Sequence, residues 1–206
     1  MNPQCAEWKT NRAPRVIKKS EDNMQELEYK FLISNERFQE LLRKANKNFG
    51  EPAEKVQTNY YYDTVDCELA RRKITVRIRE KDGQLKLQTK QHTYKEKAFL
   101  QSEETEMSIL ELPDTLNLKS FPELTLIKKG SLQTTRYSFY PTEGIDFDFD
   151  ENKYLDVYDY EIEIEFLEQH RERAEQLISD FNLIEGKDAE SKSQRFFNRQ
   201  DTLNKN

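Results

Sequence analysis

The sequence predicts an α+β fold built from about eight antiparallel strands and two long helices. Several segments alternate strictly between apolar and charged residues, as half-buried strands do, and turn residues separate them. Two further segments carry apolar residues at the 3.6-residue spacing of amphipathic helices. With 206 residues, the chain is long enough for one domain of ordinary size.

Composition narrows the classes of function. Hydrophobic and charged residues each make up 35% of the chain, so many charges must serve a purpose or lie in disordered segments. The net charge of -6 disfavours generic nucleic-acid binding. Cys5 and Cys67 lack the spacing of a disulfide framework or metal site, and no run is long enough to span a membrane. We therefore expect a cytoplasmic protein without a membrane partner.

The first 22 residues lack periodicity and are rich in basic residues. We interpret residues 1–22 as a disordered basic tail and residues 23–200 as the folded domain. The alternative is that residues 1–22 form a basic arm that binds an anionic partner.

The first strand is predicted at Met24–Ile33, MQELEYKFLI. Glu26, Glu28 and Lys30 share one face of this strand, because successive side chains alternate between faces. Side chains two residues apart lie about 7 Å apart, so the two carboxylates could hold one divalent ion or two neighbouring ones. Mg²⁺ prefers oxygen ligands of this kind.

A helix follows the first strand. Ser34 is a suitable N-cap and Gly50 a suitable C-terminal stop, and the apolar stripe between them predicts a core-facing helix. Further strands are predicted at Val56–Thr64, Ile74–Glu80, Gln84–Gln91, Phe99–Ser108, Leu132–Tyr140, Ile145–Asp150 and Leu155–Phe166.

The connections are predicted from their turn residues and charges. Asp82-Gly83 marks a hairpin turn, residues 92–98 a charged loop and residues 151–153 a turn. Residues 109–130 are less regular; we predict a short helix there, with a strand as a further option. The second long helix is predicted at 168–182, before a final segment, Ser191–Asn198.

Charges are sorted by strand. Two strands are basic, through Arg77 and Arg79 and through Lys86 and Lys90. Three strands are acidic, and their carboxylates are Glu104, Glu106, Asp146, Asp148, Asp150, Glu161, Glu163 and Glu165. A sheet whose charged face lies in water would be more stable with both signs of charge on neighbouring strands, because like charges directly opposite each other are destabilising. If the sheet closes into a barrel, the charged face lines the lumen, where acids could hold metal and bases a polyanion.

This order of motifs resembles the CYTH domain, the family of triphosphate tunnel metalloenzymes. The ExExK strand is Glu26, Glu28 and Lys30, and YYDT at 61–64 is similar to a further family segment. The other matching residues follow in the family's order: Arg77, Arg79, Lys90, Glu104, Glu106, Arg136, Asp148 or Asp150, Glu161, Glu163 and Lys192. The repeats DFDFD and EIEIE leave open whether Asp148 or Asp150, and whether Glu161/Glu163 or Glu163/Glu165, form the metal-binding set.

The resemblance implies a closed eight-stranded antiparallel barrel, covered by helices, that binds a triphosphate with Mg²⁺ or Mn²⁺. It implies that Glu26, Glu28 and Lys30 are catalytic. The implied triphosphate-binding residues are Lys30, Arg77, Arg79, Lys86, Lys90, Arg136 and Lys192. The implied metal ligands are Glu26, Glu28, Glu104, Glu106, Asp148, Asp150, Glu161 and Glu163.

The expected function is therefore metal-dependent hydrolysis of a small-molecule triphosphate. Inorganic tripolyphosphate is favoured, because no clear base-recognition element stands out and the only tryptophan, Trp8, lies in the predicted tail; Tyr60–Tyr62 could substitute as a stacking platform. The alternatives are a class IV adenylate cyclase, a thiamine or nucleoside triphosphatase, and a non-catalytic sensor of polyphosphate or nucleotide. The sequence leaves open whether the protein is a monomer or a homodimer.

Overall fold

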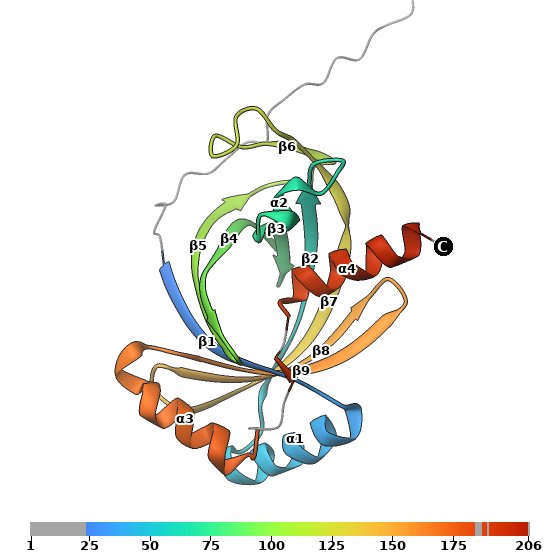
Figure 1. Cartoon of the computed structure of the whole chain (residues 1–206). Coiled ribbons are helices and arrows are strands. Elements are labelled where there is room, and N and C mark those ends of the chain that lie inside the picture. The colour runs from blue at the N-terminus through green and yellow to red at the C-terminus, as the bar shows by residue number, and fades with distance from the viewer. Residues whose placement is uncertain (1–23, 184–186, 189, 206) are drawn as a thin grey trace, which may run out of the picture.

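Eight strands close into an antiparallel barrel in the computed structural model, which describes residues 24–183, 187–188 and 190–205 (Figure 1). The order around the barrel is β1-β5-β4-β3-β2-β7-β8-β9, and β1 pairs with β9 to complete the ring. These strands are β1 (Met24–Ile33), β2 (Ala53–Asp63), β3 (Ile74–Lys81), β4 (Gln84–Glu96), β5 (Phe99–Ile109), β7 (Thr125–Thr142), β8 (Ile145–Tyr154) and β9 (Val157–Phe166). The predicted α+β barrel is confirmed.

The remaining elements lie around this barrel. Two short strands extend the sheet, β6 (Thr115–Asn117) beside β7 and β10 (Lys187–Asp188) beside β1. The helices of the described residues are α1 (Asn35–Phe49), α2 (Glu68–Arg71), α3 (Arg171–Asp180) and α4 (Lys192–Asn204), with a 3₁₀ turn at Glu168–His170.

The helices α1 and α3 cover one side of the barrel's apolar outer face (Figure 1). Ser34 caps α1 as predicted, since its Oγ accepts a hydrogen bond from the Arg37 backbone N–H at 3.3 Å. Gly50 ends the helix with φ +85°, which glycine adopts without steric cost. The buried Phe38 packs edge-on to Phe149 of β8, with ring centroids 5.8 Å apart. Burial of this interface holds β8 and β9 in a fixed position.

A second apolar cluster lies on the outer face of β3 and β4. Its buried members include Val76, Ile78 and Leu87, with Leu116 of β6 and Leu126 of β7. Residues 110–124 cross this side, so the helices are not the only cover of the apolar face.

The helix α4 packs against inward-facing side chains at one end of the barrel. Phe196 lies against Tyr61 of β2, with ring centroids 5.0 Å apart, and both side chains are fully buried. Gly130 of β7 permits this contact, because a Cβ there would lie 2.7 Å from the Phe196 ring. This anchoring brings the first turn of α4, with Lys192, into the lumen.

Three local predictions were wrong. Residues 92–96 continue β4, because the β4–β5 hairpin extends to a turn at Lys97, whose φ is +51°. Charged side chains at an exposed hairpin end can point into water, so charge alone does not signal a loop. Residues 151–153 continue β8 to a turn at Leu155, and no helix forms in 109–130. The short helix α2 was not predicted.

Two further predictions concern the ends of the chain and the membrane. The predicted tail, residues 1–22, lies outside the described residues. Among the helices of the described part, none has both the length and the apolar composition needed to cross a bilayer.

Candidate functional site

The predicted site residues converge on the lumen of the barrel. Alternation along each strand sends one set of side chains inward, and the predicted charged residues belong to that set. Nearly complete burial of charged groups requires compensation by opposite charges, and the structure provides it through a continuous network of ion pairs.

The ExExK strand forms one half of this network. Lys90 of β4 pairs with Glu26 and also lies 3.4 Å from Glu28. Lys30 reaches Glu28 at 3.4 Å and Glu163 of β9 at 2.5 Å. Burial opposes the charged form of Lys30, but Glu163 and Glu28 raise its pKa above the ordinary value. Both lysines therefore carry charge in the lumen.

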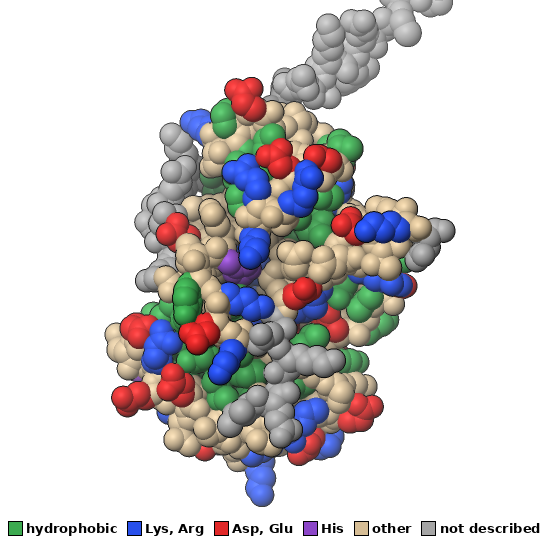
Figure 2. Space-filling view, in the orientation of Figure 1, with side chains coloured by type: hydrophobic (Ala, Val, Ile, Leu, Met, Phe, Trp, Pro, Cys, Tyr) green, Lys and Arg blue, Asp and Glu red, His purple; other side chains and the backbone are tan. Residues whose placement is uncertain are grey.

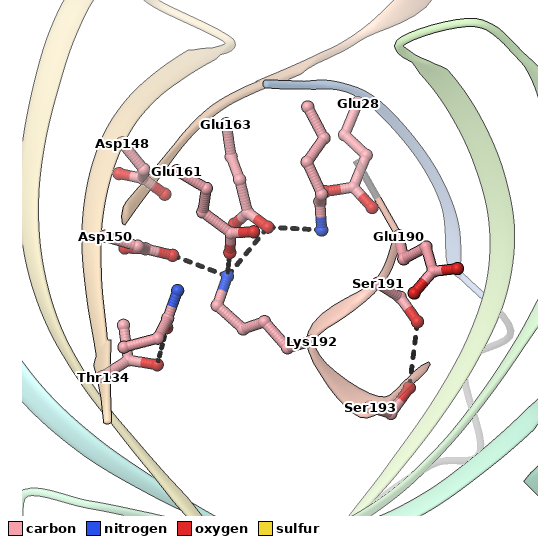
Figure 3. A network of polar contacts seen from close by, with 12 residues as sticks. Glu28, Thr134, Asp148, Asp150, Glu161, Glu163, Glu190, Ser191, Lys192 and Ser193 are labelled. Atoms are coloured by element: carbon pink, nitrogen blue, oxygen red, sulfur yellow. Dashed lines mark hydrogen bonds and ion pairs between the residues drawn. The ribbon is translucent and has the colours of Figure 1, made fainter. Parts of the chain in front are cut away.

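A group of three buried carboxylates forms the other half (Figure 3). Asp150, Glu161 and Glu163 each offer an oxygen, and these oxygens all lie within 4.8 Å of one another. The Lys192 ammonium lies among them, 2.8 Å from Asp150 and 2.9 Å from Glu163, and it also pairs with Glu161. Arg195, one turn further along α4, contacts Glu161 at 2.7 Å.

Arg136 of β7 joins both acidic strands. Its guanidinium donates two hydrogen bonds to Asp150, at 2.7 and 2.6 Å, and pairs with Asp148 at 2.5 Å and with Glu163. Asp148 and Asp150 therefore both face the lumen, and of the two only Asp150 belongs to the group of three carboxylates. Arginine binds phosphate oxygens with the same bidentate geometry.

The two arginines of β3 differ in their partners. Arg77 donates to Gln88 at 2.8 Å and approaches Glu104 at 3.5 Å. Arg79 donates to the amide oxygen of Asn59 at 3.1 Å, and no ion pair to a carboxylate of the described residues holds it. Burial and repulsion from Arg77 lower the pKa of Arg79 to about 10, so it stays charged at neutral pH.

Lys86 and Glu106 lie apart from the other predicted residues. They pair with each other, and their side chains are 40% and 31% exposed, toward one end of the barrel. Neither lines the cavity of about 70 Å³ that remains inside the tunnel. Its wall comes from Glu26, Glu28, Lys30, Gln57, Thr75, Arg77, Arg79, Lys90, His92, Arg136, Glu163, Glu165, Ser191, Lys192 and Ser193.

Sequence reasoning gave Glu165 only as an alternative, and it did not assign Gln57 or His92 a role. Glu165 continues the EIEIE alternation, and it pairs in register with Glu28 of β1. Burial, then the charges of Glu26 and Glu28, raise the pKa of Glu165 to about 8. Glu163 shows the opposite effect: burial would raise its pKa, but Lys30 and Arg136 lower it well below its ordinary value. Burial and neighbouring carboxylates thus outweigh the cations around Glu165.

The YYDT segment has a local structural role. The Asp63 carboxylate accepts hydrogen bonds from the backbone N–H groups of Thr64, Leu69 and Ala70, at 2.7 to 2.9 Å. It thereby fixes the first turn of α2. Tyr61 and Tyr62 are buried in apolar clusters, so they offer no stacking platform to a ligand.

The acidic residues fit a divalent metal. Asp150, Glu161 and Glu163 are close enough to share an ion, and oxygen is the ligand atom that Mg²⁺ and Mn²⁺ prefer. Glu26 and Glu28, which the sequence predicts as ligands on β1, are not part of this group of three. A metal ion held by the group would replace the lysine and arginine charges that now neutralise these carboxylates.

Comparison with known families identifies the family of this chain. The CYTH domain matches residues 24–197. The protein named "Putative triphosphatase YjbK" of Bacillus subtilis (strain 168) is 28% identical over 191 residues, which cover 84% of this chain and 94% of that protein.

Solved structures show the same architecture. A protein described as a putative adenylate cyclase from Bacillus halodurans is 26% identical, with a TM-score of 0.64, and the match covers 84% of this chain and 97% of that one. HpAC1 from Hippeastrum, described as a putative adenylyl cyclase with a dominant triphosphatase activity, is 22% identical, with a TM-score of 0.62 over 84% and 95% of the chains. The latter likeness establishes the fold.

Proposed function

Because the chain belongs to the CYTH domain family, we propose that it hydrolyses a triphosphate inside the barrel with the help of a divalent metal ion. One observation supports this most strongly. Buried cations and buried carboxylates meet in one narrow lumen. There a polyanion could replace the carboxylates as partner of the cations, and a metal ion could replace the cations as partner of the carboxylates. The names of the Bacillus relative and of HpAC1, both of which mention triphosphatase activity, agree with this reaction.

The cations of the lumen would bind and orient the phosphates. Lys30, Arg77, Arg79, Lys90 and Arg136 line the cavity, together with Lys192. A hydrogen bond from a charged group to phosphate contributes about 1.5–3 kcal/mol. Arg79 has no carboxylate partner among the described residues, so no ion pair there would have to break before it binds phosphate. Lys86, which lies outside this wall, would act from a distance on the electrostatic potential at the tunnel end.

The carboxylates would hold Mg²⁺ or Mn²⁺, and the bound ion would neutralise phosphate charge and polarise the scissile bond. Glu26, Glu28 and Glu163 border the same cavity as the cations, whereas Asp150 and Glu161 lie behind Lys192. Glu104 and Glu106 contact Arg77 and Lys86, so we propose for them a role in positioning these cations.

The test is phosphate release from inorganic tripolyphosphate, the substrate that the sequence favours, with Mg²⁺ and Mn²⁺ supplied separately. The Glu26→Gln/Glu28→Gln variant should lose metal-dependent release, whereas Glu103→Gln/Glu111→Gln, which changes two exposed carboxylates, should keep it. ATP and thiamine triphosphate run in parallel, and product analysis separates hydrolysis from cyclisation. Stabilisation by tripolyphosphate without turnover of any substrate would refute hydrolysis and favour a sensor.

A further inference from the structure

The middle of the inward face of β2 carries neutral polar side chains, in contrast to the arginines of β3 beside it. Gln57, Asn59 and Tyr61 share this face because they alternate along the strand, and all three are buried. Gln57 borders the tunnel cavity, so this face belongs to the lumen. In the register of the two strands, Asn59 lies opposite Arg79. Tyr61 lies opposite Arg77, so both neutral side chains are direct neighbours of arginines proposed to bind phosphate.

Asn59 and Tyr61 each have a buried hydrogen-bond donor without a partner. Neither Nδ2 of Asn59 nor the hydroxyl of Tyr61 is hydrogen-bonded within the described residues. The Asn59 amide has a fixed orientation, because the guanidinium of Arg79 can only donate and therefore bonds to Oδ1, at 3.1 Å. Burying a donor without an acceptor is costly, since its hydrogen bonds to water are lost. Two such donors on one face of a strand point to an acceptor that comes from outside the described part of the chain.

The surroundings of the Tyr61 hydroxyl are positively charged. Its ring packs on Phe196, which holds the hydroxyl in place. Burial raises the pKa of Tyr61, and the nearby charges of Arg77 and Arg195 act against this rise. Arg77 itself donates to Gln88 of β4, at 2.8 Å. Arginine cannot accept a hydrogen bond, so the hydroxyl lacks an acceptor, and the local charge favours an anionic one.

The tunnel lies next to a hollow in the surface. Figure 2 shows a histidine and lysine or arginine side chains in a hollow of the molecule. His92 and Thr75 line both the tunnel cavity and the larger cavity that adjoins it, so the two spaces share a wall. A polyanion that enters from this side meets positive charge as far as Arg77 and Arg79, beside the two unpartnered donors.

We propose that Asn59 and Tyr61 form a further phosphate-binding subsite of the tunnel, in which Nδ2 and the hydroxyl donate hydrogen bonds to oxygens of the phosphate group held by Arg79. The inference rests on the proposed triphosphate site and adds two neutral residues to its cations. A neutral donor binds an oxygen without adding charge to the lumen, where each further buried cation would need a carboxylate of its own. Binding of the phosphate supplies both donors with an acceptor, so it relieves the cost of burying them.

The first experiment removes the hydroxyl alone. Tyr61→Phe keeps the ring that packs on Phe196, and isothermal titration calorimetry in EDTA measures tripolyphosphate binding without metal-dependent hydrolysis. We expect Kd to rise about tenfold, the loss typical of one hydrogen bond to a charged group. The melting temperature of the variant without ligand should not fall, because the substitution removes a buried unsatisfied donor. A loss of stability with an unchanged Kd would show a structural role only and overturn the inference.

Tyr62→Phe is the matched control, because the Tyr62 hydroxyl belongs to the opposite face of β2 and donates to the carbonyl oxygen of Pro113 at 2.5 Å. This variant should lose stability and keep the Kd of the wild type. Asn59→Asp keeps an oxygen for Arg79 but replaces the Nδ2 donor by a second oxygen, which repels phosphate. Its Kd should rise about a hundredfold, because a hydrogen bond is lost and a like charge is added. An unchanged Kd would remove Asn59 from the subsite.

The second experiment records the ultraviolet difference spectrum of the tyrosines when tripolyphosphate binds, because a new hydrogen bond from the hydroxyl changes the absorption of the ring. The wild type and Tyr62→Phe should give this signal, and Tyr61→Phe should not. Binding without a signal that depends on Tyr61 would mean that buried water satisfies the hydroxyl, so the inference fails while the proposed hydrolysis stands. If the signal is present but no triphosphate is hydrolysed with either metal, the proposed hydrolysis fails and the subsite stands. A wild type that binds no tripolyphosphate, with or without Mg²⁺, would refute both.

Discussion

Replacing Glu165 by glutamine should stabilise the metal-free protein at alkaline pH and leave its stability at acidic pH unchanged. Burial and the neighbouring charges of Glu26 and Glu28 raise the pKa of Glu165 from 4.5 to about 8. Between these values the folded protein keeps a proton that the unfolded chain releases. The free energy of unfolding of the wild type therefore falls as pH rises from 4.5 toward 8.

The size of this effect follows from the displacement of the pKa. A tenfold change in an acid constant corresponds to about 1.36 kcal/mol, so moving from 4.5 to about 8 costs about 5 kcal/mol as an upper limit. Hydration of the lumen reduces this limit, and we expect a gain of about 2–4 kcal/mol for Glu165→Gln at pH about 8.5. At pH about 4.5 the carboxyl is protonated in the folded state, and the glutamine is an uncharged substitute of similar shape.

The assay is urea unfolding in the presence of EDTA at several pH values between about 4.5 and 8.5. Glu103→Gln, which removes an exposed carboxylate of β5, is the control and should follow the wild-type pH dependence. Parallel stability curves for Glu165→Gln and the wild type would refute the idea that carboxylates outweigh cations at this point of the lumen. With Mn²⁺ in place of EDTA, the wild type should be stabilised most at the pH where the difference is greatest, because the ion binds the ionised carboxylates of the folded state.

Three further substitutions test the charge of Lys192, the packing of α4 and the first turn of α2. Lys192→Ala leaves three buried carboxylates without their shared ammonium and should cost about 3–5 kcal/mol in thermal or urea unfolding, with part of the loss recovered by Mn²⁺. Gly130→Ala forces a Cβ against Phe196 at φ +150° and should cost about 1–3 kcal/mol, measured by calorimetry. Asp63→Ala removes the acceptor for backbone N–H groups of α2, so hydrogen exchange there should accelerate while the tunnel residues stay protected.

The sequence allowed the barrel strands to be predicted because their two faces differ sharply in chemistry. The first strand, Met24–Ile33, was predicted with the bounds that it has in the structure. Where both faces are polar, the same reasoning failed. Residues 92–96 lie in an exposed hairpin and residues 151–153 near the end of β8, and neither stretch shows an apolar alternation.

The pairing of charges in the site could not be predicted from the sequence. Alternation indicates which carboxylates share a face of one strand, but register decides which of them meet across strands. Lys192 reaches the lumen from α4, whose position depends in part on the contact between Phe196 and Tyr61, residues far apart in the chain. Glu165 differs from Glu163 in its pKa because Lys30 reaches only the latter.

The register also explains how strands whose inward-facing side chains carry charges of a single sign can pair in one sheet. Lys90 of β4 lies opposite Glu104 of β5, and Arg136 of β7 lies opposite Asp150 of β8, so some neighbouring strands neutralise each other. The strands β8 and β9 do not, because Asp150 lies directly opposite Glu161. Opposed carboxylates are destabilising in a sheet unless cations enter from elsewhere.

Those cations come from outside the β8–β9 pair. Arg136 contacts both strands, and α4 supplies Lys192 and Arg195 from one end of the barrel. The strand pair that would hold metal best is thus the pair that depends most on α4 in the absence of metal. Metal binding and the position of the first turn of α4 should therefore be coupled, because both compensate the same three carboxylates.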